Sequence, residues 1–269
     1  MATFVLVHAA WGGGWEWRRV ARRLLARDHE VFTPTLTGLG DRAHLATPDV
    51  GLGTHVQDVV ALLEAEDLTG VVLAGHSSAG MVITGVMDRA AERIGQAVYL
   101  DAVVPRDGEA FVDLVPADLV DRMIRGPAAR SGDDWLVPPP FAADELGMSN
   151  EDARWYLAGV VPHPLRFFEE TISLGDRWAT VPAITFVHCT RRSDYLPTDE
   201  ADGGREGGSF LGAFERRARA LGWDVRELAT GHDPHITDPD ELCALLDEVA
   251  RGPGDEVGKG PGEVAKGPG

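Results

Sequence analysis

Two adjacent serines, Ser77 and Ser78, occupy a short polar turn that could carry a nucleophile. The turn joins an apolar run, residues 70–75, to a run with helical spacing that begins near Met81. A strand, a sharp turn and a helix in this order are the setting of a nucleophile elbow, in which a strained serine presents its hydroxyl above the sheet. The same residues also suit a plain turn that caps a helix. The turn alone therefore leaves both interpretations open.

The neighbours of the two serines favour Ser77 as the nucleophile. An elbow needs small residues two positions before and two positions after the serine, because strand and helix approach closely there. Ser77 has Gly75 and Ala79 at these positions, whereas Ser78 has the bulky His76 two positions before it. We therefore predict that Ser77 attacks the substrate and that Ser78 supplies the backbone N–H that follows the nucleophile.

A serine nucleophile also needs a base and an acid that orients the base. His232, in "LATGHDPHIT", follows the last predicted strand and is the predicted base, while His235 is expected to start a helix or to pack. In the chain order typical of the elbow motif the acid lies between the serine and the histidine. This order predicts Asp194, in the loop after the strand at 183–190.

Other aspartates stay open as alternatives for the acid. Asp199 and Asp202 lie in the same loop as Asp194. Asp101, at the end of "VYLD", could reach the histidine from the strand that neighbours the nucleophile strand.

The glycine-rich stretch "VHAAWGGGW" (7–15) follows the first predicted strand and is a candidate for the rest of the oxyanion hole. We predict that the backbone N–H of Ala10 pairs with that of Ser78, since such donors stabilise the charge of the reacting oxygen. Trp11 and His76 are the candidate substrate-binding residues. A flexible loop with no catalytic part would have the same glycines.

Apolar runs and helical patterns alternate along the chain, which indicates a mostly parallel sheet with helices on both faces. The predicted strands are 3–8, 29–36, 70–75, 96–104, 183–190 and 223–228, and the predicted helices are 15–28, 54–67, 79–93, 210–221 and 239–250. We predict an α/β core of about six strands from residues 1–104 and 181–251. Residues 105–180 interrupt the alternation and are expected to form a helical cap over the carboxyl end of the sheet. Residues 252–269, with GPG three times, are expected to be a flexible tail.

The composition excludes several classes of function. Lys and Arg total 25 against 43 Asp and Glu, a net charge of −18. Nucleic acids and anionic membranes need clustered positive charge, so neither is an expected partner. Cys189 and Cys243 do not make a disulfide framework. The nine histidines show no metal-ligand spacing, and no metal or cofactor is expected. Without a signal-like or membrane-spanning segment, we expect a cytoplasmic protein, which could form a homodimer.

Six stretches together resemble one branch of the α/β-hydrolase superfamily, that of plant hydroxynitrile lyases and methyl-salicylate-type esterases with their bacterial relatives. They are "FVLVHAAWGGGWEW", "FTPTLTGLGDRAH", "HVQDVVALLE", "GHSSAGMV", "YLDAVVP" and "GHD", and the resemblance runs from about residue 3 to 250. It implies an α/β-hydrolase fold with a helical cap. It also implies a site whose residues are Ser77 as nucleophile, His232 as base, Asp194 as acid, and Ala10 with Ser78 as oxyanion donors.

The sequence departs from the pattern of this branch at several positions. His8-Ala9 replaces a His-Gly pair, and Ala79 replaces the glycine that follows the elbow. Both changes add a methyl group near the oxyanion site and so alter its shape. The lyases of the branch resemble a pattern with threonine at position 9 and lysine at position 233, where this sequence has Ala9 and Asp233. Because Asp233 would repel a leaving anion such as cyanide, we do not expect cyanohydrin cleavage.

The sequence thus predicts a serine hydrolase that cleaves an ester or thioester of a small, fairly apolar carboxylic acid through an acyl-enzyme. Its expected partner is this small-molecule substrate. Two alternatives remain open. One is a cyclase, dehydratase or decarboxylase of natural-product biosynthesis that uses His232 as acid and base without an acyl-enzyme. The other is a non-catalytic ligand-binding protein with the same fold.

Overall fold

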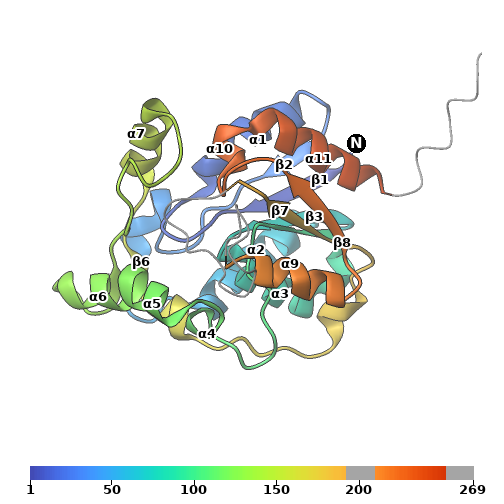
Figure 1. The fold of residues 1–269 in the computed structure, drawn as a ribbon. Helices are drawn as coiled ribbons and strands as arrows, with labels where there is room; N and C mark the ends of the chain where they lie inside the picture. Colours follow the sequence, from blue (N-terminus) through green and yellow to red (C-terminus); the bar gives the residue numbers. More distant parts are fainter. Residues whose placement is uncertain (192–209, 253–269) are drawn as a thin grey trace, which may run out of the picture.

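A six-stranded sheet forms the centre of the protein (Figure 1). The structure is a computed structural model that describes residues 1–191 and 210–252. In their order across the sheet, the strands are β2 (Glu30–Phe32), β1 (Thr3–Val7), β3 (Val71–His76), β4 (Ile94–Leu100), β7 (Ile184–Cys189) and β8 (Asp224–Leu228). Every neighbouring pair is parallel. All six carboxyl ends therefore meet at one edge of the sheet.

Alternate residues of each strand point to opposite sides of the sheet. Both sets of side chains are mostly apolar, and helices cover both faces. In β1, Phe4 and Leu6 pack in one apolar cluster, while Val5 and Val7 pack in the other. The first face is covered by α1 (Arg18–Leu25) and α11 (Pro239–Arg251), and the second by α2 (Leu52–Ala65), α3 (Ala79–Ala90) and α9 (Gly212–Ala220). The predicted α/β-hydrolase architecture is confirmed.

Residues 105–180 contain short helices and one small antiparallel pair of strands. Their elements are α4 (Phe111–Leu114), α5 (Ala117–Val120), the π-helix η4 (Asp121–Arg125), α6 (Gly126–Arg130), β5 (Leu136–Val137), α7 (Asn150–Gly159), β6 (His163–Pro164), α8 (Arg166–Glu169) and η5 (Arg177–Thr180). In Figure 1, α5, α6 and α7 lie to one side of the sheet. The small β5–β6 pair was not predicted. The exact limits of the cap stay a prediction, and residues 253–269 of the predicted tail lie outside the described residues.

The remaining elements are short and connect the larger ones. They are η1 (Gly14–Trp17), η2 (Gly40–Leu45), η3 (Ala91–Arg93) and α10 (Pro234–Thr237). None of the helices within 1–191 and 210–252 combines the length and the apolar character that a membrane span requires.

The strand predicted over 96–104 ends earlier than expected, and this corrects the prediction. β4 stops at Leu100, because Asp101 takes a φ of 43°, outside the range of extended backbone. The carboxylate that follows "VYL" is therefore on a sharp bend at the carboxyl end of the sheet and not inside a strand.

Candidate active site

Ser77 has the backbone conformation that a nucleophile elbow requires. Its φ is 56°, whereas Ser78 has a φ of −63° and an ordinary helical conformation. A positive φ is uncommon for a residue with a side chain and is retained where the surroundings enforce it. Here the Ser77 N–H donates to the carbonyl of Leu100 (3.1 Å), and the Ser77 carbonyl accepts from the N–H of Val103 (3.1 Å). Two backbone hydrogen bonds thus fix the strained turn against the end of β4.

Glycines on both sides of the elbow allow the close approach that it needs. A Cβ on Gly75 would lie 2.8 Å from Cγ2 of Ile83, inside α3. A Cβ on Gly80 would lie 1.9 Å from the carbonyl oxygen of Val103. No side chain fits at either position without movement of the backbone, so these glycines keep Ser77 in place.

His232 lies at the same edge of the sheet and is held by Asp101. Its Nδ1–H donates to Oδ2 of Asp101 at 2.7 Å, and both side chains are buried. The other oxygen of Asp101 accepts from the backbone N–H of Cys189 (3.2 Å) and lies 3.4 Å from Nδ1 of His188. The carboxylate is therefore fixed from the neighbouring strand β7, and it orients the imidazole of His232.

The contact between Asp101 and His232 changes the pKa of both groups. Burial disfavours the charged imidazole, but the hydrogen bond and the negative charge of Asp101, with the charge of Asp233, outweigh it and raise the pKa of His232. Burial likewise disfavours the carboxylate, yet the hydrogen bonds from His188 and His232 lower the pKa of Asp101. At neutral pH the pair has a buried anion beside an imidazole that is able to take a proton.

Asp194, the predicted acid, lies outside the described residues, as do Asp199 and Asp202. In the described part of the chain, Asp101 fills the position against Nδ1 of His232 that Asp194 was expected to fill. Among the described residues, the structure thus brings the alternative acid, Asp101, into contact with the base.

The expected oxyanion pair is arranged differently from the prediction. The N–H of Ala10 donates to the Ser78 hydroxyl at 2.8 Å instead of pointing at an open position. Ser78 is a small residue at the start of α3, so its side chain can reach the loop after β1. A substrate oxygen has to displace this hydroxyl before it can accept from Ala10.

Residues 4–245 match the family model described as "Alpha/beta hydrolase family". The chain belongs to this family. It is 36% identical over 251 residues to the carbendazim hydrolyzing esterase of Nocardioides sp. (strain SG-4G), a match that covers 91% of this chain and 98% of the relative. It is 32% identical to salicylic acid-binding protein 2 of Nicotiana tabacum, covering 92% of this chain and 96% of the relative.

A solved structure agrees with this assignment. An extracellular α/β-hydrolase from a Paenibacillus species superposes with a TM-score of 0.76 at 24% identity, covering 92% of this chain and 98% of that one. At this identity the likeness establishes the fold. Together with the family match and the two relatives, it confirms the predicted family and branch.

In this α/β hydrolase, Ser77 and His232 line one cavity beneath the cap. Most of the other described lining residues are apolar or aromatic, and Asp233 is the carboxylate among them. The cap side chains of the cavity are Phe111, Val115, Leu119, Met123, Ile124, Phe141 and Tyr156. No lysine or arginine is among the described lining residues. The cavity therefore suits an uncharged, apolar group next to the reacting carbonyl.

The two predicted substrate-binding residues both border this cavity, but both are largely fixed by protein contacts. Trp11 donates from Nε1 to the carbonyl of Val137 (2.9 Å) and meets the ring of Phe141 edge to face. His76 donates from Nε2 to the backbone carbonyl of His232 (2.8 Å). His76 thus supports the segment with the base, a role that its position beside Ser77 did not suggest.

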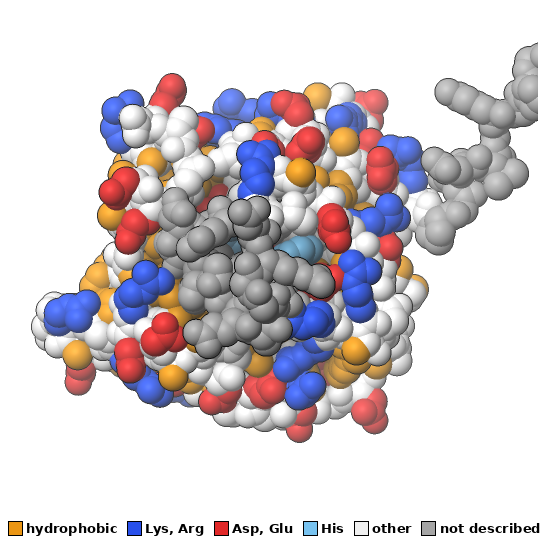
Figure 2. Space-filling view, in the orientation of Figure 1, with side chains coloured by type: hydrophobic (Ala, Val, Ile, Leu, Met, Phe, Trp, Pro, Cys, Tyr) orange, Lys and Arg blue, Asp and Glu red, His pale blue; other side chains and the backbone are white. Residues whose placement is uncertain are grey.

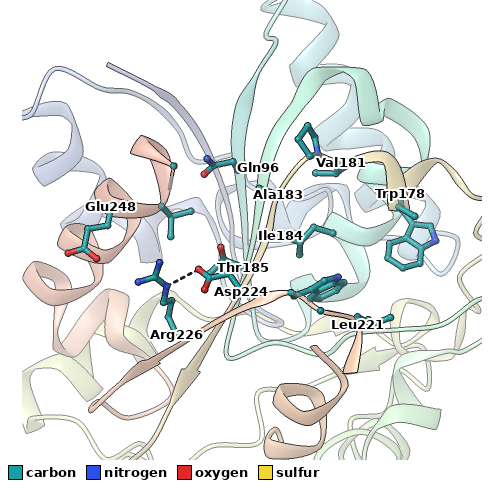
Figure 3. A pocket seen from close by; sticks show the side chains of 16 residues that line it. Gln96, Trp178, Val181, Ala183, Ile184, Thr185, Leu221, Asp224, Arg226 and Glu248 are labelled. Atoms are coloured by element: carbon teal, nitrogen blue, oxygen red, sulfur yellow. Dashed lines mark hydrogen bonds and ion pairs between the residues drawn. The ribbon is translucent and has the colours of Figure 1, made fainter. Parts of the chain in front are cut away.

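A second, more open groove of the hydrolase lies at the opposite end of the sheet (Figure 3). Gln96, Thr185 and Asp224, from the amino-terminal parts of β4, β7 and β8, line it together with Trp178 and Leu221. Neither Ser77 nor His232 is part of it. On the face of the molecule in Figure 2, acidic and basic side chains lie interspersed over the surface.

Sequence reasoning missed two polar residues next to the site. His188 contacts Asp101 from inside β7, where it is one polar residue in a mostly buried strand. Glu16 is buried in η1 and lies 3.9 Å from His235. The position of Glu16, a charged residue between Trp15 and Trp17 in an otherwise apolar segment, was the signal that could have identified it.

Proposed function

We propose that this α/β hydrolase cleaves an ester or thioester of a small, apolar carboxylic acid with Ser77 as nucleophile, His232 as base and Asp101 as acid. The observation that carries the proposal is the 2.7 Å contact between Nδ1 of His232 and Asp101, in a cavity that Ser77 also lines. The esterase name of the Nocardioides relative, which matches across nearly the whole chain, supports ester cleavage.

The proposed reaction has two halves. With Nδ1 engaged by Asp101, Nε2 of His232 is the nitrogen that takes the Ser77 proton. The Ser77 oxygen then attacks the carbonyl carbon, and the negative oxygen is held by the N–H groups of Ser78 and Ala10 after the Ser78 hydroxyl has been displaced. His232 returns its proton to the leaving alcohol or thiol. A water molecule then repeats the sequence on the acyl-enzyme and releases the acid.

The lining of the cavity supports an apolar substrate. A charged group of the substrate would lose its hydration there without a lysine or arginine among the described lining residues to compensate. The rings of Phe111 and Phe141 and the side chains of Leu119 and Met123 instead offer contacts to alkyl or aromatic groups.

A panel of p-nitrophenyl esters with acyl chains of increasing length tests the proposal. We expect turnover of short apolar esters, loss of nearly all turnover in Ser77→Ala, and covalent labelling of Ser77 by a fluorophosphonate probe. Ser78→Ala is the matched control, because it removes the neighbouring hydroxyl and leaves the proposed nucleophile. Folded protein that neither turns over esters nor reacts with the probe would contradict the proposal and favour an acid–base enzyme or a ligand-binding protein.

A further inference from the structure

Three polar side chains form a closed cluster behind the candidate site. Glu16, His76 and His235 are each at most 1% exposed, and one ligand atom from each lies within 4.8 Å of the other two. Among these, Oε2 of Glu16 and Nε2 of His235 are 3.9 Å apart, too far for a direct hydrogen bond.

Five polar atoms of this cluster have no hydrogen-bond partner within the described residues. They are both oxygens of Glu16, both ring nitrogens of His235 and Nδ1 of His76. Buried polar groups without partners are rare in proteins, and each one calls for an explanation such as a bound ion. One ligand atom from each of the three residues lies close enough to the other two that an ion between them would satisfy all three.

The local sequence is adapted to hold the carboxylate of Glu16 in the cluster. A Cβ on Gly12 would lie 1.6 Å from Oε1 of Glu16, so only glycine leaves room for it. In the described chain, no lysine or arginine forms an ion pair with Glu16. A cation is the missing partner that would stabilise the charged form.

We propose that Glu16, His76 and His235 bind a divalent first-row transition-metal ion, for which Zn²⁺ is the probe. Two imidazoles and one carboxylate are a ligand set that such ions accept. His76 also has the support that metal-binding histidines usually have: its Nε2–H donates to the carbonyl of His232, which leaves the lone pair of Nδ1 for the ion. Ligand atoms about 2.0–2.2 Å from Zn²⁺ stand closer together than those of the cluster, so the side chains have to move inward slightly on binding.

The ion would connect three segments that are far apart in the sequence. Glu16 lies in η1, His76 at the end of β3 and His235 in α10. Through His76, the ion would hold the backbone of His232 in place. The role of the ion is structural, and it does not rest on the proposed ester hydrolysis.

Metal content tests the site independently of activity. The full chain is expressed with added Zn²⁺, passed over a gel-filtration column in metal-free buffer and analysed by mass spectrometry for metal per chain. We expect about one equivalent in the wild type and about a tenth of that or less in Glu16→Gln and His235→Gln. His55→Gln is the matched control, since it also removes a buried histidine, and it should keep the ion. Removal of the ion by a chelator should lower the Tm by about 5 °C.

Two results would overturn the proposal. One is a wild-type protein that holds about a tenth of a Zn²⁺ ion per chain or less despite added Zn²⁺. This result would mean that a water molecule or a shared proton joins the three side chains. The other is folded Glu16→Gln that retains the full metal content, which would place the ion elsewhere. If a variant fails to fold, the wild-type chain loaded with Co²⁺ is measured in its place. An absorption spectrum of a four-coordinate Co²⁺ ion with nitrogen and oxygen ligands would support the site, and the absence of such a spectrum would overturn the proposal.

Discussion

Two groups of buried histidines in this protein differ in their hydrogen-bond partners: His232 contacts a carboxylate, whereas His8 and His55 contact the backbone. His232 is bonded to Asp101, and its pKa is raised. His8 and His55 are equally buried, but both ring nitrogens of His8 and Nε2 of His55 bond to backbone groups, and burial lowers the pKa of each histidine to about 4. Burial alone thus keeps an imidazole neutral, and a carboxylate in direct contact reverses this effect.

The comparison explains which histidine can act as a base. The Nδ1–H of His8 donates to the carbonyl of Ala9 (2.8 Å), while its Nε2 accepts from the N–H of Leu36 (3.1 Å). Both nitrogens of His8 are therefore occupied in the neutral form, and a further proton has no favourable site. His232 has a buried anion that stabilises the charge it gains when it takes the proton of a nucleophile.

The largest expected effect comes from removing the carboxylate that distinguishes the two groups. Asp101→Asn should lower kcat on the best p-nitrophenyl ester by about 10⁴, the loss known for the equivalent change in another serine hydrolase. The amide leaves the shape nearly unchanged but no longer fixes the tautomer of His232 or stabilises its charge.

Asp194→Asn is the control for this experiment, since Asp194 was the preferred acid from sequence. We expect it to retain most of the activity. The opposite pattern, an active Asp101→Asn and a nearly inactive Asp194→Asn, would show that the contact of Asp101 with His232 is not the functional one.

The neutral histidines should affect stability instead of activity. Because the pKa of His55 is about 4 in the folded protein and about 6.5 in the unfolded chain, the unfolded chain takes up the proton first as the pH falls. The stability that neutral His55 contributes is present above pH 6.5 and is lost towards pH 4, and about 2 kcal/mol of it disappears between pH 7 and pH 5.

Urea unfolding of His55→Gln at both pH values checks this expectation. Between pH 7 and pH 5, the free energy of unfolding of the variant should fall by about 2 kcal/mol less than that of the wild type. His44→Gln, which removes an exposed histidine, is the control for the loss of an imidazole. An equal pH dependence in wild type and His55→Gln would show that His55 is already protonated in the folded protein.

The smallest effect is expected at the oxyanion site. Ser78→Ala removes the hydroxyl that accepts from Ala10 but keeps the backbone N–H of residue 78. Turnover should stay within about tenfold of the wild type, because the loss of a true oxyanion donor costs about 10²–10³. A loss in that larger range, measured as kcat on the same ester, would mean that the Ser78 hydroxyl itself donates to the reacting oxygen.

The sheet and the elbow could be predicted from sequence because their signals are local. Strands such as "TFVLV" and the turn at Ser77 reflect the properties of neighbouring residues, and the small residues around the turn indicated the correct frame of the bend. His232 was predicted to be near the site because it follows the last strand.

The contact of Asp101 with His232 and the buried cluster could not be predicted in this way, because they depend on contacts between distant segments. Asp101 and Asp194 both follow strands and both lie between Ser77 and His232 in the chain, and the loop after the strand before the last favoured Asp194. The bend at Asp101 and its distance to His232 appear only once β4 lies between β3 and β7. Glu16 and His235 likewise come together only through the packing of η1 against α10.

An NMR titration of the histidine rings tests most directly whether the carboxylate of Asp101 is what separates His232 from the other buried histidines. The wild type and Asp101→Asn are titrated side by side, and His232→Gln identifies the resonance of His232. We predict that His232 in the wild type titrates above the ordinary value of about 6.5 and that His8 and His55 titrate near 4. Asp101→Asn should lower the pKa of His232 and of His188, which also contacts Asp101, and should leave those of His8 and His55 unchanged. A His232 that titrates below the ordinary value in the wild type, or whose pKa is unchanged in Asp101→Asn, would contradict this account.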